Sequence, residues 1–343
     1  MYFDNKNMST KFTLIIPCYN AKKFLFSLIN SINRSVLKPR QIIFVNDCST
    51  DDTYNFLLNV KIKNIKIDVV STPKNLGPGG ARNYGVKFSK NKNLMFIDAD
   101  VNLKKNTTQI FIQKINKYNS IVGIYNYKTL NTGFFQEFKS YYYYFMLYKK
   151  FDYKYSIFSA SCSGIKIDLF NKIRGYDNWF GENKIDYENE DFGNRLKMHT
   201  DIWLVPEMQV FHFFPNNIRL FKTLFFRSSH WIEFFFFKQK EKFNFDEAGG
   251  TQLQAIKCIL SFTSLFLLIL SLFFYSNALI FLFLTLILII GVVNNKFLKF
   301  ISGHSRNRFK FFIGLIIFET VIVFGALFGL LKILLKISKF YKK

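Results

Sequence analysis

Two aspartates one residue apart, Asp98 and Asp100, follow an apolar run at residues 94–97. Four consecutive apolar residues are typical of a short strand that is buried on both faces. A core strand does not need two carboxylates at its end for stability. At this spacing, where the chain turns, both acids can converge on one hard cation. The pair indicates a metal site at a strand end, but an isolated pair more often marks an Asp-rich turn, so the surrounding chain must decide.

The elements that would position this pair alternate regularly along the first hundred residues. We expect strands at residues 12–16, 41–45, 67–70 and 93–98, and helices at 21–33, at 51–59 and beginning at residue 81. Strands that alternate with helices of this length predict an α/β fold with a doubly wound, largely parallel sheet. Such a sheet binds its ligand at the carboxyl ends of its strands, which is where Asp98 and Asp100 stand.

Three further features follow expected strands. Asp47 ends the second strand, where its carboxylate can accept hydrogen bonds from a base N–H or a ribose hydroxyl. A glycine-rich loop at residues 77–80 lets the backbone approach a ligand closely, and Arg82 just beyond it is placed to meet a diphosphate. Glu190 and Asp191 begin a helix, whose dipole favours ionised carboxylates, and either can take the proton from an attacking hydroxyl. The features together predict a nucleotide-diphosphate site beside an acidic catalytic group.

These motifs, in this order, resemble glycosyltransferase family 2, whose members have the GT-A fold. The matching stretches are I-I-P-C-Y-N at 15–20, V-N-D-C-S-T-D-D-T at 45–53, N-L-G-P-G-G-A-R-N-Y-G at 75–85, I-D-A-D at 97–100 and N-E-D at 189–191. The resemblance covers residues 10–235. It implies a nucleotide-diphosphate sugar as donor, a divalent metal ion (Mg²⁺ or Mn²⁺) and inversion at the anomeric carbon.

The resemblance also implies a role for each matching residue. Asp191 is the expected catalytic base, and Glu190 beside it is the other candidate. The expected metal ligands are Asp98, Asp100 and His212, with a purely structural role left open for the histidine. The residues expected on the donor side are Pro17, Tyr19, Asn20, Asp47, Asn75, Gly79, Arg82 and Asp98, and those on the acceptor side are Gly164, Gly175 and Asp177. Tyr176 and Asn178 stand where the family more often has Phe and Glu, a departure that concerns the acceptor contacts and not the chemistry.

Composition narrows the class of partner. The 343 residues carry a net charge of +24, but no compact block of lysines and arginines dominates, so nucleic acid is not an expected partner. The four cysteines form no C-x-x-C pair and fit a reducing compartment. Residues 1–10 lack an apolar core, so we expect no signal peptide there.

Three apolar runs, at residues 258–275, 278–293 and 311–331, predict a membrane domain of two to three helices. Only Ser276 and Asn277 separate the first two runs, which indicates a helical hairpin. The basic loop at 294–310 favours the cytoplasmic side for itself and for the catalytic part. A third span would place the C-terminal lysines outside, against that rule, so the run at 311–331 crosses, is re-entrant or lies in the interface. We expect a GT-A domain at 1–235, a linker or interfacial segment at 236–255 and the membrane domain at 256–343.

The sequence thus predicts an inverting, metal-dependent glycosyltransferase of the inner (cytoplasmic) membrane whose catalytic domain faces the cytoplasm. The expected acceptor is a lipid or a lipid-linked glycan in cell-envelope or surface glycan assembly. The stretch at 134–155, rich in Tyr and Lys, suits a membrane interface or a lipid phosphate, or else forms an ordinary amphipathic helix. Around Arg227 there is no Q-x-x-R-W motif of processive family members, which favours addition of a single sugar. The alternatives are transfer to a polyprenyl phosphate and, from another class, a catalytically inactive membrane scaffold.

Overall fold

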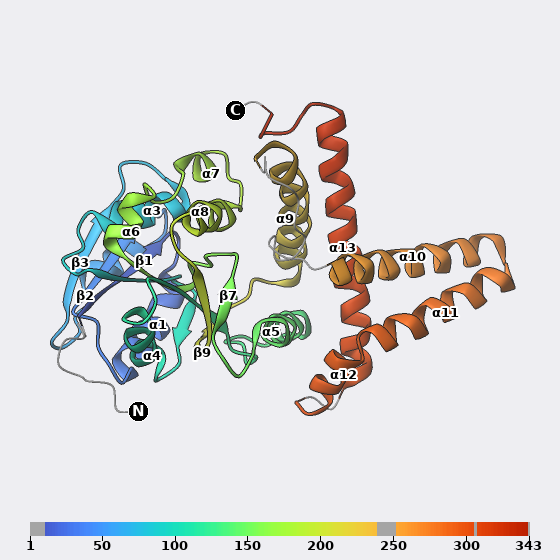
Figure 1. Ribbon diagram of the computed structural model, residues 1–343, viewed down its shortest axis with the longest axis horizontal. Helices are drawn as coiled ribbons and strands as arrows, with labels where there is room; N and C mark the ends of the chain where they lie inside the picture. Colours follow the sequence, from blue (N-terminus) through green and yellow to red (C-terminus); the bar gives the residue numbers. More distant parts are fainter. Residues whose placement is uncertain (1–10, 239–251, 305–306, 342–343) are drawn as a thin grey trace. The chain divides into compact units, whose positions relative to one another are not determined.

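The computed structural model describes residues 11–238, 252–304 and 307–341 (Figure 1). Contacts within the chain divide it into two compact units. The first unit comprises Met1–Asn131 and Met146–Phe213, and the second comprises Thr132–Phe145 and Phe214–Lys343. Most of the expected linker at 236–255, like residues 1–10, lies outside the described residues.

The first unit is built on a nine-stranded sheet. Its strands are β1 (Phe12–Cys18), β2 (Gln41–Asn46), β3 (Lys66–Ser71), β4 (Asn93–Ile97), β5 (Val101–Leu103), β6 (Ser120–Tyr125), β7 (Tyr153–Tyr155), β8 (Cys162–Lys166) and β9 (Ile202–His212). The order across the sheet is β3-β2-β1-β4-β8-β6-β9-β5, and β7 pairs with β9. The strands β1 to β4 are parallel, whereas β8 runs antiparallel to both β4 and β6. The predicted α/β fold is confirmed, with a sheet that is parallel in its first four strands and mixed beyond them.

Helices cover both faces of this sheet. They are α1 (Lys22–Arg34), α2 (Thr53–Leu58), α3 (Gly77–Val86), α4 (Thr107–Ile115), α6 (Ile167–Lys172), α7 (Asn178–Glu182) and α8 (Glu188–Lys197). Because side chains alternate along a strand, Leu14 and Ile16 of β1 join one core with α1 and α4, while Ile15 joins another with α3 and α8. At Gly85 of α3, a Cβ would lie 2.8 Å from methyl groups of Ile15 and Val45, so glycine lets α3 lie close to the sheet.

The second half of the sheet departs from the prediction in two places. Pro206 would be expected to divide residues 202–213 into two strands, but residues 202–212 form the single strand β9. Its pairing with β6 shifts between Val122 and Ile124, and this irregularity accommodates Pro206, which has no N–H to donate to a ladder. The short strand β5 was not predicted. It follows Asp100 directly and pairs Val101 with His212.

The second unit is helical. It contains α5 (Phe134–Leu147) as far as Phe145, α9 (Asn217–Lys238), α10 (Gln252–Phe274), α11 (Asn277–Val293), α12 (Asn295–Ser302) and α13 (Arg308–Leu334). Within this unit, α10 and α11 form a hairpin whose direction crosses that of α13 (Figure 1). Residues 132–145 and 214–235, which the sequence assigned to the first domain, have their contacts with these helices.

Two helices of the described part of the chain, α10 and α13, are long and apolar enough to cross a membrane. The remaining predicted run, at 278–293, forms α11, which is bent by 66° against α12 and counts as a span only if the bent pair is one. All three predicted apolar runs are therefore helical, and their composition indicates membrane association.

Candidate active site

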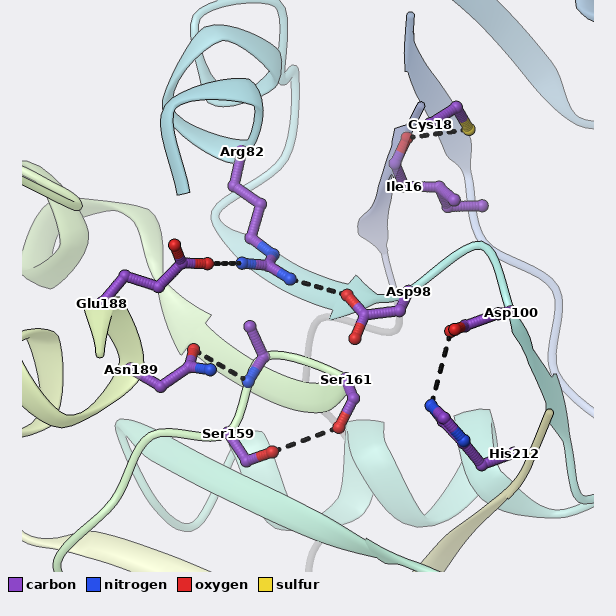
Figure 2. Close-up of polar contacts among 11 residues, drawn as sticks. Ile16, Cys18, Arg82, Asp98, Asp100, Ser159, Ser161, Glu188, Asn189 and His212 are labelled. Atoms are coloured by element: carbon purple, nitrogen blue, oxygen red, sulfur yellow. Dashed lines mark hydrogen bonds and ion pairs between the residues drawn. The ribbon is translucent and has the colours of Figure 1, made fainter. Parts of the chain in front are cut away.

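The two predicted strand-end acids Asp98 and Asp100 have different partners. Figure 2 shows the Arg82 guanidinium between two carboxylates, with Nη2 2.6 Å from Oδ1 of Asp98 and Nη1 3.2 Å from Oε1 of Glu188. The Arg82 side chain is only 3% exposed. We expected this arginine to meet a diphosphate, but the structure buries it between two acids from different elements. Its contacts assign it a positioning role, because it fixes the end of β4 against the start of α8.

Burial and charge act against each other in this contact. Burial would lower the pKa of Arg82, but Asp98, Tyr176 and Glu188 more than offset it and leave the pKa above its ordinary value. Burial raises the pKa of Glu188 to about 7, although Arg82 opposes the shift.

Asp100 faces His212, the last residue of β9. Its Oδ1 lies 3.6 Å from His212 Nε2, a contact that the pairing of β5 with β9 creates (Figure 2). The ring of His212 also packs on Tyr125, with centroids 4.6 Å apart. The sequence predicted this histidine for the metal site, but it did not predict the short strand β5 that brings His212 to Asp100.

The predicted metal ligands Asp98, Asp100 and His212 fit a divalent ion only in part. Within the described part of the chain, no three His, Cys, Asp or Glu side chains converge closely enough to hold one. Mg²⁺ sites, however, often use one or two carboxylates and leave the other positions to substrate phosphates and water. Asp100 and His212 fit such a substrate-completed site, and Asp98 keeps Oδ2 without a partner among the described residues. The three side chains therefore remain the predicted metal ligands.

Asp47 follows β2 and ties together the loops after three parallel strands. Its Oδ1 accepts hydrogen bonds from Thr72 Oγ1 at 2.7 Å and from the Leu76 amide at 2.9 Å. Its own amide donates to the Cys18 carbonyl, and its carbonyl accepts from Asn75 Nδ2 at 3.1 Å. Because two internal donors fix Oδ1, the carboxylate is held in one orientation, and Oδ2 has no protein partner in the described chain. This geometry suits a carboxylate that receives an N–H or O–H from a ligand.

The residues after β1 divide into a structural and an exposed part. Asn20, with φ of 50°, uses Oδ1 to accept from the amides of Thr50 and Asp51 at 2.8 and 3.2 Å. These bonds make Asn20 a clamp between the loops after β1 and β2. Pro17 is half-buried within β1, where it pairs with Val45 of β2, and Tyr19 is 54% exposed. Of the three residues, Tyr19 is the one most available to a planar ligand.

The glycine-rich loop makes its close approaches to protein rather than to open space. A Cβ on Gly77, whose φ is +71°, would lie 2.7 Å from Cα of Gly181 in α7. A Cβ on Gly79 would lie 3.1 Å from the Tyr176 side chain. The glycines therefore let the start of α3 press against α7 and Tyr176, which gives them a packing role, and the donor contact of Gly79 stays a prediction.

Gly164, expected on the acceptor side, lies instead in the core of the first unit. It is in β8, and a Cβ there would lie 2.2 Å from the ring of Phe111 in α4. The glycine makes room for this ring, so its contacts are those of a packing residue. The other two expected acceptor-side residues, Gly175 and Asp177, lie in the loop before α7, where Asp177 caps the helix by accepting from the Trp179 amide at 3.0 Å.

The predicted catalytic acids lie in the first turn of α8, as expected. Asp191 Oδ2 accepts from Arg195 Nε at 2.9 Å, and Arg195 Nη1 donates to the carbonyls of Ile173 and Gly175 at 2.6 and 2.7 Å. Arg195 thereby links Asp191 to the predicted acceptor-side loop and leaves Asp191 Oδ1 without a partner among the described residues. Glu190 is 9% exposed. Of the two candidates, Asp191 has the more accessible carboxylate.

Sequence reasoning missed two positioning residues. Glu188 was not among the predicted site residues, and its contact with Arg82 depends on α3 and α8 lying on the same face of the sheet. Tyr176 stacks on Phe192 of α8 with ring centroids 4.3 Å apart, which connects the glycine-rich loop to the helix that carries Asp191. The only sequence signals were the acid run at 188–191 and the Tyr in place of Phe at 176.

Comparison with known proteins finds similarity in the first part of the chain. The family model described as "Glycosyl transferase family 2" matches residues 13–174. Poly(ribitol-phosphate) beta-N-acetylglucosaminyltransferase TarS of Staphylococcus aureus is 30% identical over 124 residues, which are 35% of this chain and 22% of TarS. UDP-Glc:alpha-D-GlcNAc-diphosphoundecaprenol beta-1,3-glucosyltransferase WfaP of Escherichia coli is 34% identical over 88 residues, which are 26% of this chain and 34% of WfaP. The chain thus spans between about a fifth and a third of the length of these relatives.

One solved structure is similar over most of the chain. The mannosyltransferase PcManGT from Pyrobaculum calidifontis, in complex with GDP-Man and Mn²⁺, has a TM-score of 0.57. The match covers 93% of this chain and 86% of that one at 12% identity. At this identity the likeness concerns the fold, and it confirms the GT-A architecture expected from the motifs.

Proposed function

Because residues 13–174 match the model of glycosyltransferase family 2, we propose that the chain transfers a sugar, with inversion, from a nucleotide-diphosphate sugar to a membrane-bound acceptor. One observation carries the proposal. Asp47 and Asp98 follow β2 and β4, two parallel strands that flank β1, so both acids stand at the same edge of the sheet. That edge is where an open α/β sheet binds its ligand.

The donor's base and ribose are assigned to the corner around Asp47. Its fixed carboxylate offers Oδ2 as acceptor to a base N–H or a ribose hydroxyl, and Tyr19, which follows the Cys18 carbonyl bonded by the Asp47 amide, offers an exposed ring. Asn75 supports the corner by donating to the Asp47 carbonyl. Asp47 Oδ1, by contrast, is engaged by protein donors, which favours a single contact to the base over a bidentate one.

The diphosphate is assigned to the edge between Asp98 and His212. A divalent ion bound there would neutralise the negative charge that grows on the leaving nucleotide diphosphate. Asp100 and His212 would hold the ion together with Oδ2 of Asp98. This chain's own contribution is to fix these side chains in place, through Arg82 for Asp98 and through the pairing of β5 with β9 for Asp100.

Asp191 is the proposed general base. Arg195 fixes its Oδ2, so Oδ1 can accept the proton of the acceptor hydroxyl as the oxygen attacks the anomeric carbon. The position of Asp191 in the first turn of α8 favours its ionised form. Arg195 also bonds the loop that carries Gly175, so the base and the proposed acceptor loop are positioned together.

The proposed acceptor is a lipid or a lipid-linked glycan. The support is the apolar α10 and α13 of the second unit and the relative WfaP, whose name gives a diphosphoundecaprenol acceptor. We place the chain in the cytoplasmic membrane, with its catalytic unit facing the cytoplasm, in cell-envelope or surface glycan assembly. Transfer to a polyprenyl phosphate is the second candidate, because an anionic acceptor needs little help from a base.

The test is release of nucleotide from a panel of UDP- and GDP-sugars by the full chain in detergent, with Mg²⁺ or Mn²⁺ and with EDTA. Acceptors are undecaprenyl phosphate, an undecaprenyl-diphosphate sugar and buffer alone. We expect metal-dependent release of one nucleotide that a lipid-linked acceptor accelerates, and a loss in Asp100→Asn. Asp201→Asn, which changes an exposed carboxylate paired with Lys154, is the matched control. Absence of both turnover and nucleotide binding would reject the proposal in favour of an inactive scaffold.

A further inference from the structure

The last long helix, α13, packs against α9 at backbone distance. A Cβ on Gly325 would lie 2.3 Å from the Phe225 carbonyl oxygen, and one on Gly329 would lie 2.6 Å from the Ser229 carbonyl oxygen. Small residues four apart are the usual means by which two helices approach this closely. Because the two helices are in backbone contact, α9 and α13 must lie at the same depth relative to a membrane.

A buried ion pair fixes the register of this contact. Glu233 of α9 is fully buried, accepts from Lys332 of α13 and also accepts from Ser338 Oγ at 2.5 Å. Gly325 thus lies beside Phe225, Gly329 beside Ser229 and Lys332 beside Glu233, so α9 and α13 run in the same direction. Both helices advance at the same rise per residue, so this register can be followed back toward their starts.

The register places exposed charge beside the middle of α13. Arg219 and Lys222 of α9 are exposed and lie one to two turns before Phe225. They therefore stand beside the centre of the apolar run at 311–331. If α13 crossed a bilayer, both cations would be exposed at the depth of the hydrocarbon centre, where Lys and Arg are least tolerated.

We propose that α13 lies along the membrane surface beside α9 and does not cross the bilayer, so that the α10–α11 hairpin is the inserted part of this unit. The partner of α13 is then the phospholipid surface. Its outward side carries large apolar residues at spacings of three and four, which would lie at the acyl boundary: Phe324, Leu327, Leu331 and Leu334, 48–77% exposed. The opposite side carries Gly325 and Gly329 against α9.

This arrangement also places the basic residues on one side. Lys299 in α12 and Lys336 after α13 flank the helix and are exposed. With α13 on the surface, both belong to the side that carries the catalytic unit, in agreement with the preference of lysine for cytoplasmic loops. With α13 across the bilayer, they would lie on opposite sides.

Sidedness can be measured with single cysteines in a Cys48→Ser background, since the other three cysteines are buried. Lys299→Cys and Lys336→Cys are treated with a membrane-impermeant maleimide in intact cells and in inside-out vesicles. We expect both to react from the same side, in equal yield, without detergent. Reaction from opposite sides would overturn the proposal. The readout does not depend on activity, so it stands or fails independently of the proposed transfer reaction.

A second pair of positions tests depth. Lys222→Cys, beside the centre of α13, should react with the impermeant reagent in sealed inside-out vesicles at the rate of Lys61→Cys, an exposed site on the first unit. Phe281→Cys in α11, at a residue 71% exposed, should react only after the bilayer is dissolved. Protection of Lys222→Cys to the level of Phe281→Cys would show that α9 and α13 lie in hydrocarbon and would reject the surface arrangement.

Discussion

The two units each bury an ion, and they use it differently. In the first unit Arg82 is buried between Asp98 and Glu188, which come from the end of β4 and the start of α8. In the second unit Glu233 of α9 is buried against Lys332, Ser229 and Ser338, which lie along the α9–α13 contact. Both ions satisfy the rule that a buried charge needs partners.

The difference lies in what the partners do. Of the two carboxylates on Arg82, Asp98 is itself a predicted metal ligand and Glu188 lies three residues before the predicted base Asp191, so this contact sets the distance between two parts of the proposed site. The partners of Glu233 carry no proposed chemistry and join two helices. Damage to the first contact should therefore affect both turnover and stability, and damage to the second should affect stability alone.

The largest expected effect is on the base that α8 carries. Asp191→Asn should lower the rate of transfer to a hydroxyl acceptor roughly 10²–10⁴-fold, because an amide cannot take the proton. The melting temperature should hardly change, since an amide oxygen can still accept from Arg195. The measurement is single-turnover transfer at saturating donor, with Glu182→Gln, a surface carboxylate near Lys74, as the control.

The size of this loss also separates the two proposed acceptors. An undecaprenyl phosphate acceptor is already ionised, so its transfer should fall much less than that of a hydroxyl acceptor. Equal, near wild-type rates with both acceptors would remove Asp191 from the role of base and direct attention to Glu190.

The next largest effect is on the free energy of unfolding, which can be compared for the two buried ions. Arg82→Met leaves two carboxylates without their cation and should lower the free energy of unfolding by about 3–5 kcal/mol. Glu233→Gln keeps acceptor and donor atoms for the serines and leaves Lys332, 13% exposed, able to reach water, so about 1–3 kcal/mol should be lost. The measurement is thermal and denaturant unfolding of the full chain in detergent.

Turnover per folded molecule distinguishes the two roles. It should fall in Arg82→Met and in Arg82→Lys, because a single ammonium cannot bridge both acids as the planar guanidinium does. It should stay at the wild-type value in Glu233→Gln. Unchanged turnover in Arg82→Lys would show that Arg82 supplies charge and stability without positioning the site.

The same comparison shows what the sequence could predict. The strands β1 to β4 and the acids after them follow local rules, namely apolar runs, helix spacing and polar residues at strand ends. Asp47, Asp98 and Asp191 were predicted from such patterns and lie where the patterns place them. The three apolar runs of the second unit were predicted in the same way.

What could not be predicted depends on contacts between distant segments. No local pattern around Arg82 predicts that its guanidinium will bond Glu188, which is 106 residues away in the sequence. The glycines at 77 and 79 have the composition of a ligand loop, but α7 and Tyr176 occupy the space beside them. Gly164 matches a family motif, but the structure requires a glycine there because the ring of Phe111 fills the space that a side chain would occupy. In each case the sequence singled out the residue, but the neighbour that it contacts is determined by how distant elements pack.

The smallest expected effect is a pH dependence that the burial of Glu188 creates. Burial raises the pKa of Glu188 from 4.5 to about 7, so between these values the folded chain binds more protons than the unfolded chain. The free energy of unfolding should therefore fall as the pH rises from 4.5 to 7, by about 1–3 kcal/mol from this group. Glu188→Gln keeps an acceptor for Arg82 without a titrating proton, so its melting temperature should fall less between pH 5 and pH 8 than that of the wild type. Parallel curves for the two proteins would mean that Arg82 holds Glu188 ionised throughout, and the contact would then be a plain buried ion pair like that of Glu233.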